Sequence, residues 1–425
     1  MNRGMKDSGI KWIGLIPNDW RIGRVKEAFC RQKNKAKQEN PIILTLARSG
    51  VKVRDISNNE GQLAESYYDY NPVKIGDFLM NTMDLYSGAN CSVSKVEGVI
   101  SPAYANLRAK DNYDPYYYDY YFKTQYWGMV LFAHGKGVSF DHRWTLNNET
   151  LMNYYIPIPS EQEQQQIADY LDKKVSEIDS IITQTTLSIE EYKKYKQSFI
   201  TEVVTKGLNP DVEMKDSGIE WIGKMPSNWT INKFKYIFCI VGGSGFKEHL
   251  QGETAGDFPF CKVSDINHIG KYVKASNNYV SKDEVKENHF NIIPKNSVII
   301  AKIGEALKKN HRKINSVDCC IDNNLEAFIP KYKNDLTYLY YLLSSIDMFW
   351  FDNQGTIPSI NNEKLKNFYL PMIHINEQIA IGNYLDNKTS EIDNNISQKQ
   401  QLITELENYK KSLIYECVTG KMEVD

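Results

Sequence analysis

The chain contains the same opening twice. Residues 5–29 read MKDSGIKWIGLIPNDWRIGRVKEAF, and residues 214–238 read MKDSGIEWIGKMPSNWTINKFKYIF. Fourteen of these 25 positions are identical at a constant offset of 209 residues. A fixed-offset repeat of this length indicates that one structural unit occurs twice in the chain.

A second repeated block closes each copy. LNNETLMNYYIP at 146–157 matches INNEKLKNFYLP at 360–371, at an offset of 214 residues. The register continues through YLDKKVSEID at 170–179 and YLDNKTSEID at 384–393. The residues between the matched ends show little alignable similarity. Alike ends predict one shared structural role, and unlike middles predict two different ones.

Each closing block runs into a long amphipathic helix. Apolar residues recur at steps of three and four from Ile167 and again from Ile381, with no proline inside either run. Helices of roughly 40–45 residues would extend about 60–67 Å at ~1.5 Å per residue, too far for one globular core. We therefore expect the two apolar stripes to bury each other as an antiparallel coiled coil. Two unrelated bundle helices are the alternative.

These blocks set the predicted domain boundaries. We expect a globular domain over 1–158, a long helix over 159–208, a second globular domain over 209–372 and a second long helix over 373–425. The predicted fold class is α+β. Two mixed α/β domains are joined by two long antiparallel helices, and the whole carries a pseudo-twofold internal repeat.

Short strands interrupted by turns are expected in the two middles. Strand-like runs lie at 41–46, 77–80 and 298–301. Tyrosine-rich segments near 114–126 and 335–350 are expected to form short helices. The middles are therefore predicted to hold mixed or antiparallel sheets.

Charge is divided unevenly along the chain. The whole carries 51 Lys and Arg against 53 Asp and Glu, a net charge of −2. The predicted domains carry +4 and +1, whereas the two helical segments carry −3 and −4. A uniformly basic nucleic-acid binder is excluded. Acidic helices would avoid a DNA backbone and leave the two globular domains to contact it.

Basic and amide side chains gather on the predicted loops of both middles. Such groups hydrogen-bond base edges and hold phosphates, and glycine runs at 135–137 and 242–245 would let a backbone approach a phosphate. The candidate DNA-binding residues are Arg48, Lys52, Arg54, Asn81, Lys136, His142 and Arg143 in the first middle, and Ser244, Lys247, Lys262, Ser264, Lys302, Lys308, Lys309, His311 and Arg312 in the second.

Signatures of catalysis and of metal binding are missing from the sequence. The seven cysteines form no CxxC pair, and no phosphate-binding GxxxxGK[ST] loop occurs. A nuclease-like PD…ExK pattern at 210–215 has the wrong spacing, and Asp114-Pro-Tyr-Tyr117 lacks the second proline of an adenine methyltransferase loop. We predict no catalytic residue and no metal site in this chain. The alternatives are an enzyme with an unseen motif and a coiled-coil scaffold that joins two protein-binding modules.

Neither a signal peptide nor an apolar run of about 18 residues is visible in the sequence. A cytoplasmic location is therefore expected, with no membrane partner.

The repeated order resembles the specificity subunit of a type I restriction–modification enzyme. The resemblance rests on WIGLIP at 12–17 and WIGKMP at 221–226, each followed by a tryptophan, and on Glu-Gln pairs at 163–164 and 377–378 that precede the repeated YLD. It covers essentially the whole chain. Met372-Ile-His374 departs from the family, because a Pro-Pro turn is absent there.

This resemblance implies a mechanism and a set of partners. Each middle would be a target-recognition domain, so that the chain reads an asymmetric bipartite site on double-stranded DNA. Two modification subunits would bind near the ends of the helices, carry S-adenosylmethionine and methylate adenine. Restriction subunits would then hydrolyse ATP with Mg²⁺ and cleave. The specificity subunit of a fused type II system would differ only in its partner. The four tryptophans of the repeated openings are expected to be packing anchors.

Overall fold

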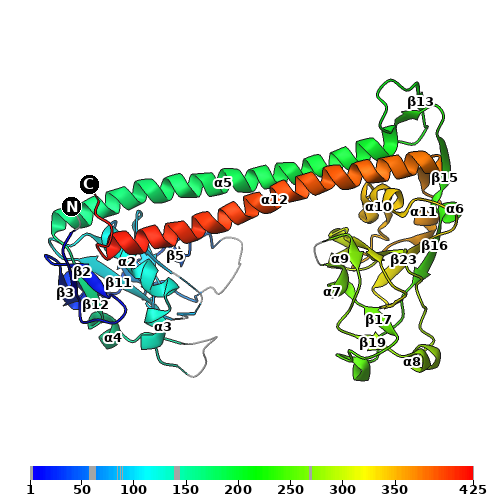
Figure 1. Cartoon of the computed structure of the whole chain (residues 1–425). Coiled ribbons are helices and arrows are strands. Elements are labelled where there is room, and N and C mark those ends of the chain that lie inside the picture. The colour runs from blue at the N-terminus through cyan, green and yellow to red at the C-terminus, as the bar shows by residue number, and fades with distance from the viewer. Residues whose placement is uncertain are drawn as a thin grey trace. The chain divides into compact units, whose positions relative to one another are not determined.

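The computed structural model describes residues 3–56, 64–83, 85–86, 88, 90–137, 144–267 and 270–424. The chain divides into two compact units (Figure 1). Unit 1 comprises Met1–Thr186 and Gln401–Asp425, and unit 2 comprises Leu187–Gln400. Helices α5 (Glu161–Lys206) and α12 (Ile375–Val418) contribute one stretch each to both units.

Unit 1 packs short helices against an antiparallel sheet with the strand order β4-β11-β8-β9. Its core joins that sheet, α2 and the adjoining stretches of α5 and α12. Besides α5 and α12, its elements are β1 (Met5–Asp7), β2 (Leu15–Pro17), β3 (Arg21–Arg24), α1 (Val25–Ala28), β4 (Phe29–Gln32), β5 (Leu44–Ala47), β6 (Gly50–Val53), β7 (Asn71–Val73), β8 (Phe78–Asn81), β9 (Cys91–Val93), β10 (Gly98–Ile100), β11 (Tyr104–Ala109), α2 (Pro115–Trp127), α3 (Val130–His134), α4 (Asn148–Met152) and β12 (Tyr155–Ile158).

Unit 2 has a five-stranded sheet with the order β16-β23-β20-β21-β18 and a three-stranded sheet β19-β17-β22. Both sheets are mixed, because β18 pairs with β21, and β17 with β22, in parallel. Besides α5 and α12, its elements are β13 (Met214–Asp216), β14 (Lys224–Pro226), β15 (Thr230–Lys233), α6 (Phe234–Ile237), β16 (Phe238–Gly242), η1 (Glu248–Leu250), β17 (Phe258–Cys261), α7 (Val263–Ile266), β18 (Tyr272–Val273), β19 (Tyr279–Val280), α8 (Lys282–Glu287), β20 (Val298–Ala301), α9 (Glu305–Lys308), β21 (Arg312–Asn315), β22 (Cys320–Ile321), β23 (Leu325–Pro330), α10 (Leu336–Ser344), η2 (Met348–Phe351), α11 (Asn362–Lys366) and β24 (Tyr369–Met372).

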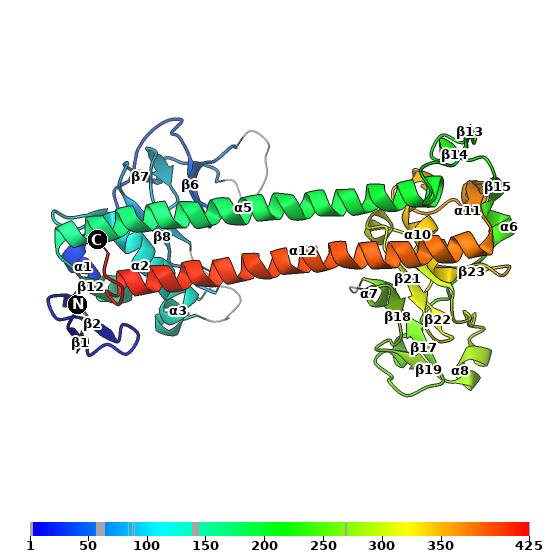
Figure 2. The ribbon, with the colours of Figure 1, turned by 45° about the horizontal axis from the view of Figure 1, so that its top comes forward.

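The two predicted long helices are present and pack side by side within each unit (Figure 2). In unit 2 the Lys196 ammonium lies 2.6 Å from the Asp393 carboxylate, and Lys399 Nζ lies 5.6 Å from the Tyr192 ring centre. Because the partner number falls as the residue number rises, the helices are antiparallel there. The Lys399 ammonium thus lies over an aromatic face of the facing helix.

The repeated tryptophans anchor each opening segment to the start of a long helix. Trp20 and Trp229 are buried, as predicted. The Trp20 indole N–H donates to the Glu163 carboxylate at 2.8 Å, and that of Trp229 donates to Glu377 at 3.1 Å. The acidic residue of each Glu-Gln pair therefore fixes the opening segment onto the helix.

The glutamine of each pair fixes the middle of its unit in the same way. The Gln164 side-chain oxygen accepts the backbone N–H of Asp114 at 2.9 Å, and Gln378 accepts that of Asp335 at 2.8 Å. Asp114 and Asp335 are the N-caps of α2 and α10. Asp114-Pro115, weighed above as a methyltransferase-like loop, is thus the start of a helix.

The aspartate of each repeated YLD accepts a hydrogen bond from a tyrosine of the same short helix, α2 in unit 1 and α10 in unit 2. The Tyr120 hydroxyl donates to Asp172 at 2.7 Å, and the Tyr341 hydroxyl donates to Asp386 at 2.6 Å. In unit 2 the Lys271 ammonium also lies 2.6 Å from Asp386. The repeated openings are therefore attached to the long helices through a glutamate, and the two divergent middles through a glutamine and an aspartate.

Candidate nucleic-acid interface

A β-hairpin in unit 1 presents three of the predicted residues. Strands β5 and β6 pair antiparallel, with Thr45 opposite Lys52. Arg48 lies in the turn and is exposed, Lys52 on β6 is exposed, and Arg54 directly after β6 is half-buried. The buried leucines of β5 hold the hairpin on the core, and its basic side chains lie at the surface.

Asn81 and Lys136 occupy two further surface positions of unit 1. Asn81 ends β8; its side-chain oxygen accepts the Met83 N–H at 3.0 Å, and its carbonyl accepts the Tyr126 hydroxyl at 2.6 Å. Lys136 pairs with Thr145 in an isolated bridge and is exposed. The predicted residues His142 and Arg143 lie outside the described part of the chain.

A polar cavity of about 280 Å³ adjoins the same hairpin, lined by β6, β9, α2 and α5. Its wall includes Lys95, a basic residue that the sequence interpretation missed, beside Asp119 and Lys123. Lys123 pairs with Asp119 at 2.8 Å, while burial raises the pKa of Asp119. Lys95 reaches this wall because β9 packs beside β6, so no local pattern could have identified it.

Several predicted residues of unit 2 lie on a turn next to α7 and on the segment that joins α9 to β21. His311 Nδ1 lies 3.0 Å from the Asn267 side-chain oxygen, which joins the residue after α7 to the residue before β21. Ser264 on α7 and Lys309 at the end of α9 are exposed. Lys308 is also exposed and pairs with Glu305 at 2.7 Å. This surface offers hydroxyl, imidazole and ammonium groups together.

Its electrostatics keep His311 neutral near pH 7. Partial desolvation lowers the pKa of the exposed His311 below its ordinary value, and the positive charges of Lys313, Lys309 and Arg312 lower that pKa further. A neutral imidazole donates from one nitrogen and accepts at the other. His311 is therefore suited to hydrogen bonding in the free protein, and an approaching phosphate would favour its protonation.

The remaining predicted residues of unit 2 are less concentrated. Lys247 is exposed at the start of η1. Lys262 Nζ donates to the Gln251 side chain and lies 4.0 Å from the Phe246 ring centre. Ser244 forms a parallel bridge with Asp322, and Lys302 is half-buried beside Gly242. Lys262 is the member of this set that is held most firmly.

Arg312 lies in the interior, in contrast to its prediction as a surface contact. It is buried on β21, and its guanidinium donates to the Asn310 side chain at 2.7 Å and to the Ile346 carbonyl at 2.9 Å. Burial lowers its pKa to about 10. This arginine joins β21 to the end of α10, and we leave it out of the DNA-facing surface.

One glycine of each run is required by packing inside its unit. A side chain at Gly243 would lie 2.0 Å from the Asp322 carbonyl oxygen, and one at Gly135 would lie 2.8 Å from the Trp144 ring. Both glycines therefore admit a close internal neighbour. Phosphate contact is not needed to explain either position.

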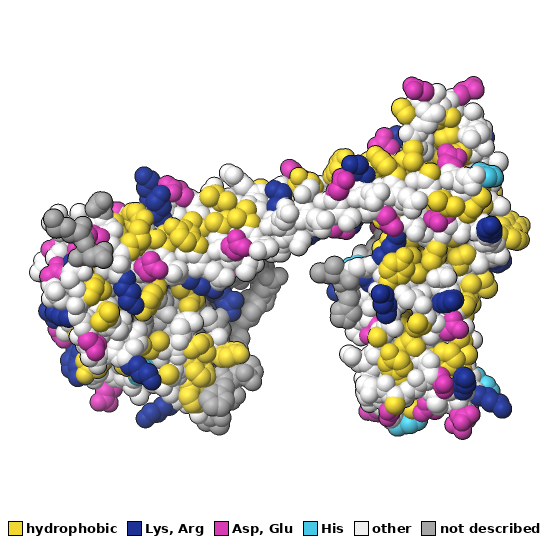
Figure 3. Space-filling view, viewed as in Figure 1, with side chains coloured by type: hydrophobic (Ala, Val, Ile, Leu, Met, Phe, Trp, Pro, Cys, Tyr) yellow, Lys and Arg dark blue, Asp and Glu magenta, His cyan; other side chains and the backbone are white. Residues whose placement is uncertain are grey.

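Lys and Arg side chains are scattered over the face shown in Figure 3, and Asp and Glu lie between them. Across the described residues no group of three or more His, Cys, Asp or Glu side chains could hold a metal ion. Among the described helices none is both long and apolar enough to cross a membrane. The face shown in Figure 3 thus offers dispersed charged groups instead of one basic patch.

A comparison with models of protein families finds a family whose domain matches both units. The family model described as type I restriction modification DNA specificity domain matches residues 74–191 and 226–408. These two matches cover most of the chain, one for each copy of the repeat.

Curated relatives agree with this family match. The type I restriction enzyme MjaVIII specificity subunit of Methanocaldococcus jannaschii is 26% identical over 341 residues, covering 77% of this chain and 75% of the relative. The putative MjaX specificity subunit of the same organism is 24% identical over 438 residues, covering 97% and 96%. The EcoR124I/EcoR124II specificity subunit of Escherichia coli is 22% identical over 309 residues, covering 68% and 69%.

Solved structures show the same fold. A chain from a study of complex assembly and conformational transition of the type I R-M system gives a TM-score of 0.75 at 15% identity, covering 96% of this chain and 99% of that one. The HsdS subunit from Thermoanaerobacter tengcongensis gives a TM-score of 0.55 at 15% identity, covering 96% and 98%.

Proposed function

This chain belongs to the family of type I restriction–modification specificity subunits and serves in DNA recognition, and we propose that each of its units reads one half of an asymmetric, bipartite site on double-stranded DNA. The observation that carries the proposal is a contrast: the two middles are attached to the long helices in the same way, but they differ in internal structure. A glutamine and an aspartate of each long helix hold both middles to their helices alike, and a glutamate holds each opening. The middles themselves differ in strand order. Similar attachment with different surfaces suits two different half-sites.

The proposed DNA-facing groups follow from the positions described above. In unit 1 they are the β5–β6 hairpin, Asn81 and Lys136, with His142 and Arg143 kept as predictions from the sequence. In unit 2 they are led by Ser264, Lys309 and His311. Such side chains combine phosphate contacts, which give affinity, with hydrogen bonds to base edges, which give specificity.

We propose that α5 and α12 form an antiparallel coiled coil that fixes the gap between the half-sites. Their antiparallel contacts within unit 2 support this role. So does the length of the helices, 46 and 44 residues. A continuous helix resists bending over many turns, so its length can set a separation.

The proposed partners are two modification subunits, which carry S-adenosylmethionine and methylate adenine, and restriction subunits, which hydrolyse ATP with Mg²⁺. The chain itself is proposed to be a non-catalytic targeting subunit that acts in the cytoplasm. Exposed apolar side chains on the helices supply surface for docking, namely Ile181, Leu402 and Tyr409 in unit 1 and Leu187, Ile379 and Tyr384 in unit 2.

A titration with DNA across salt concentrations tests the proposal. The complex of this chain with the modification subunit encoded beside it should bind its site tightly and lose affinity steeply as salt rises, because phosphate contacts release counterions. The chain alone should methylate no DNA. Salt-independent binding, or no binding to any DNA, would favour the scaffold interpretation.

A further inference from the structure

Unit 2 contains an open pocket of about 560 Å³ beside the end of α5, lined by side chains from four separate segments. Its walls are aromatic. Trp221 stacks on Phe368 with ring centres 5.5 Å apart and planes 19° apart, and Trp350 lies 6.3 Å from Phe368. Trp350 is 52% exposed, an unusual position for so large an apolar group. The pocket therefore presents aromatic faces to an incoming group.

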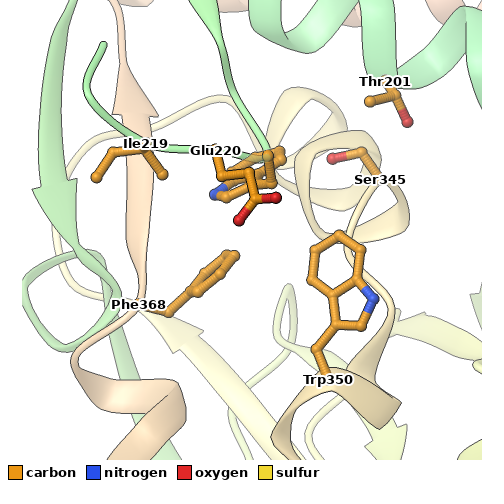
Figure 4. A pocket seen from close by; sticks show the side chains of 7 residues that line it. Thr201, Ile219, Glu220, Ser345, Trp350 and Phe368 are labelled. Carbon is orange, nitrogen blue, oxygen red and sulfur yellow. The ribbon is translucent and has the colours of Figure 1, made fainter.

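The pocket is also lined by one acidic side chain, that of Glu220. Figure 4 shows Glu220 with its carboxylate directed into the space between Phe368 and Trp350. Glu220 is exposed, and no ion-pair partner for it lies within the described part of the chain. Aromatic faces carry negative potential, and a carboxylate adds to it, so this combination attracts a cation.

Two of the walls, Trp221 and Phe368, are held from behind. The Trp221 indole N–H donates to the Tyr369 carbonyl at 3.0 Å, and Phe351 contacts Phe368 edge-to-face at 4.9 Å. A site whose walls are fixed before binding loses little entropy when it is filled. Its volume lies in the range of pockets that bury a small ligand, and it exceeds the needs of one ion.

The repeat offers a comparison within the same molecule. In unit 1 Trp12 stacks on Tyr154 as Trp221 stacks on Phe368, but His134 lies 4.7 Å from Trp12. The position that matches Glu220 is Lys11, and the position that matches Thr201, which lines the pocket, is Tyr415. Tyr415 already holds Lys421 Nζ at 4.2 Å from its ring centre. Unit 1 therefore lacks the acidic group and carries a cation of its own.

We propose that the pocket of Glu220, Trp221, Trp350 and Phe368 binds an arginine or lysine side chain, flanked by apolar residues, of a modification subunit. This proposal rests on the proposed function. The complementarity of charge favours a basic group, and the apolar walls favour one carried on a polypeptide over a free, hydrated cation. Because unit 1 has no equivalent site, the two modification subunits dock unequally, and the one at unit 2 gains a contact that the other lacks.

The test measures how many modification subunits each variant of the full chain binds, by native mass spectrometry over a range of subunit concentrations. Glu220→Lys and, separately, Trp350→Ala should weaken one of the two binding steps by about tenfold, the range expected for loss of a cation held on aromatic faces. At intermediate concentration the complex with one modification subunit should then predominate. The other step should keep its affinity.

Two control variants make the result specific. Glu287→Lys reverses an exposed carboxylate on α8 of the same unit, outside the pocket, and Lys11→Ala changes the matching position of unit 1. Both should bind two modification subunits as the unmodified chain does. Circular dichroism with an unchanged melting temperature checks that the Glu220 and Trp350 variants are folded.

The possible outcomes separate the two proposals. If the unmodified chain binds two modification subunits and the pocket variants bind both with unchanged affinities, the pocket proposal is overturned and the proposed function stands. If both steps weaken equally, unequal docking is wrong. If the unmodified chain binds no modification subunit, the proposed partners and the pocket proposal fail together.

Discussion

At the scale of single residues, burial decides which polar groups are available to a partner. Arg312 and His311 are neighbours in sequence and were predicted to share one role. Arg312 donates to two internal acceptors, whereas His311 is exposed. His311 lies in the segment before β21, whereas Arg312 is the first residue of that strand, whose four residues are all buried.

Replacing Arg312 should therefore destabilise the protein. Arg312→Met leaves the Ile346 carbonyl and the Asn310 side chain without their donor, and should lower the free energy of unfolding of unit 2 by about 2–4 kcal/mol. Urea denaturation measures this change, with the exposed Lys309→Met as the matched control. Unchanged stability together with lost DNA binding would instead make Arg312 a DNA contact.

His311 should link DNA binding to pH. Its pKa in the free protein lies below the ordinary value of 6.5. A bound phosphate favours the charged imidazole and so raises that pKa, which means that affinity rises as the pH falls towards the free-protein pKa. NMR titration of the ring with and without DNA reports both values. Equal pKa values in the two states would show that no phosphate lies near His311.

At the scale of elements, the sequence predicted the repeated parts best. The helix periods are local patterns, and the structure contains both long helices. Local features also bound them: the Glu163 N–H donates to the Ser160 hydroxyl at 3.2 Å, and Gly207 and Gly420 have positive φ angles. The predicted helices at 114–126 and 335–350 correspond to α2, and to α10 with η2.

The sites that the sequence did not predict form where segments far apart in the chain come together. The polar cavity beside Lys95 forms only where β6 meets β9, and the aromatic pocket forms only where the second opening meets η2 and the segment before β24. Lys271 reaches Asp386 across 115 residues. No periodicity within either segment encodes such contacts.

The repeated glutamines give an element-scale prediction. Gln164→Leu leaves the buried N–H of Asp114 unpaired, and should destabilise the start of α2 by about 1–3 kcal/mol. Hydrogen exchange should quicken at α2 while α10 is unaffected. Gln378→Leu should do the reverse. Simultaneous loosening of α2 and α10 in either variant would show that the two attachments are not independent.

At the scale of the whole molecule, the internal repeat makes recognition modular. Charge removal at Lys52 and Lys136 should weaken discrimination at one half-site only, and removal at Lys309 and Lys247 should weaken it at the other, because each pair belongs to a different unit. Competition binding with DNA altered in one half at a time measures the effect. Equal losses at both halves would contradict separate recognition by the units.

The helices carry the other whole-molecule prediction. Inserting about one helical turn of residues after Ile182 should change the gap between the half-sites or abolish recognition, since a helix rises ~1.5 Å per residue. The sequence of each half-site should stay the same where recognition survives. An unchanged gap with full activity would remove the proposed role of the helices in setting the separation.

The central claim is that one chain reads two different half-sites at a fixed separation. Its most direct test is a genome-wide map of adenine methylation in a methylation-free host that expresses this chain with the modification subunit encoded beside it. We predict a single asymmetric motif of two specified parts and an unspecified gap of constant length. A palindromic or uninterrupted motif, or methylation without sequence preference, would contradict the claim.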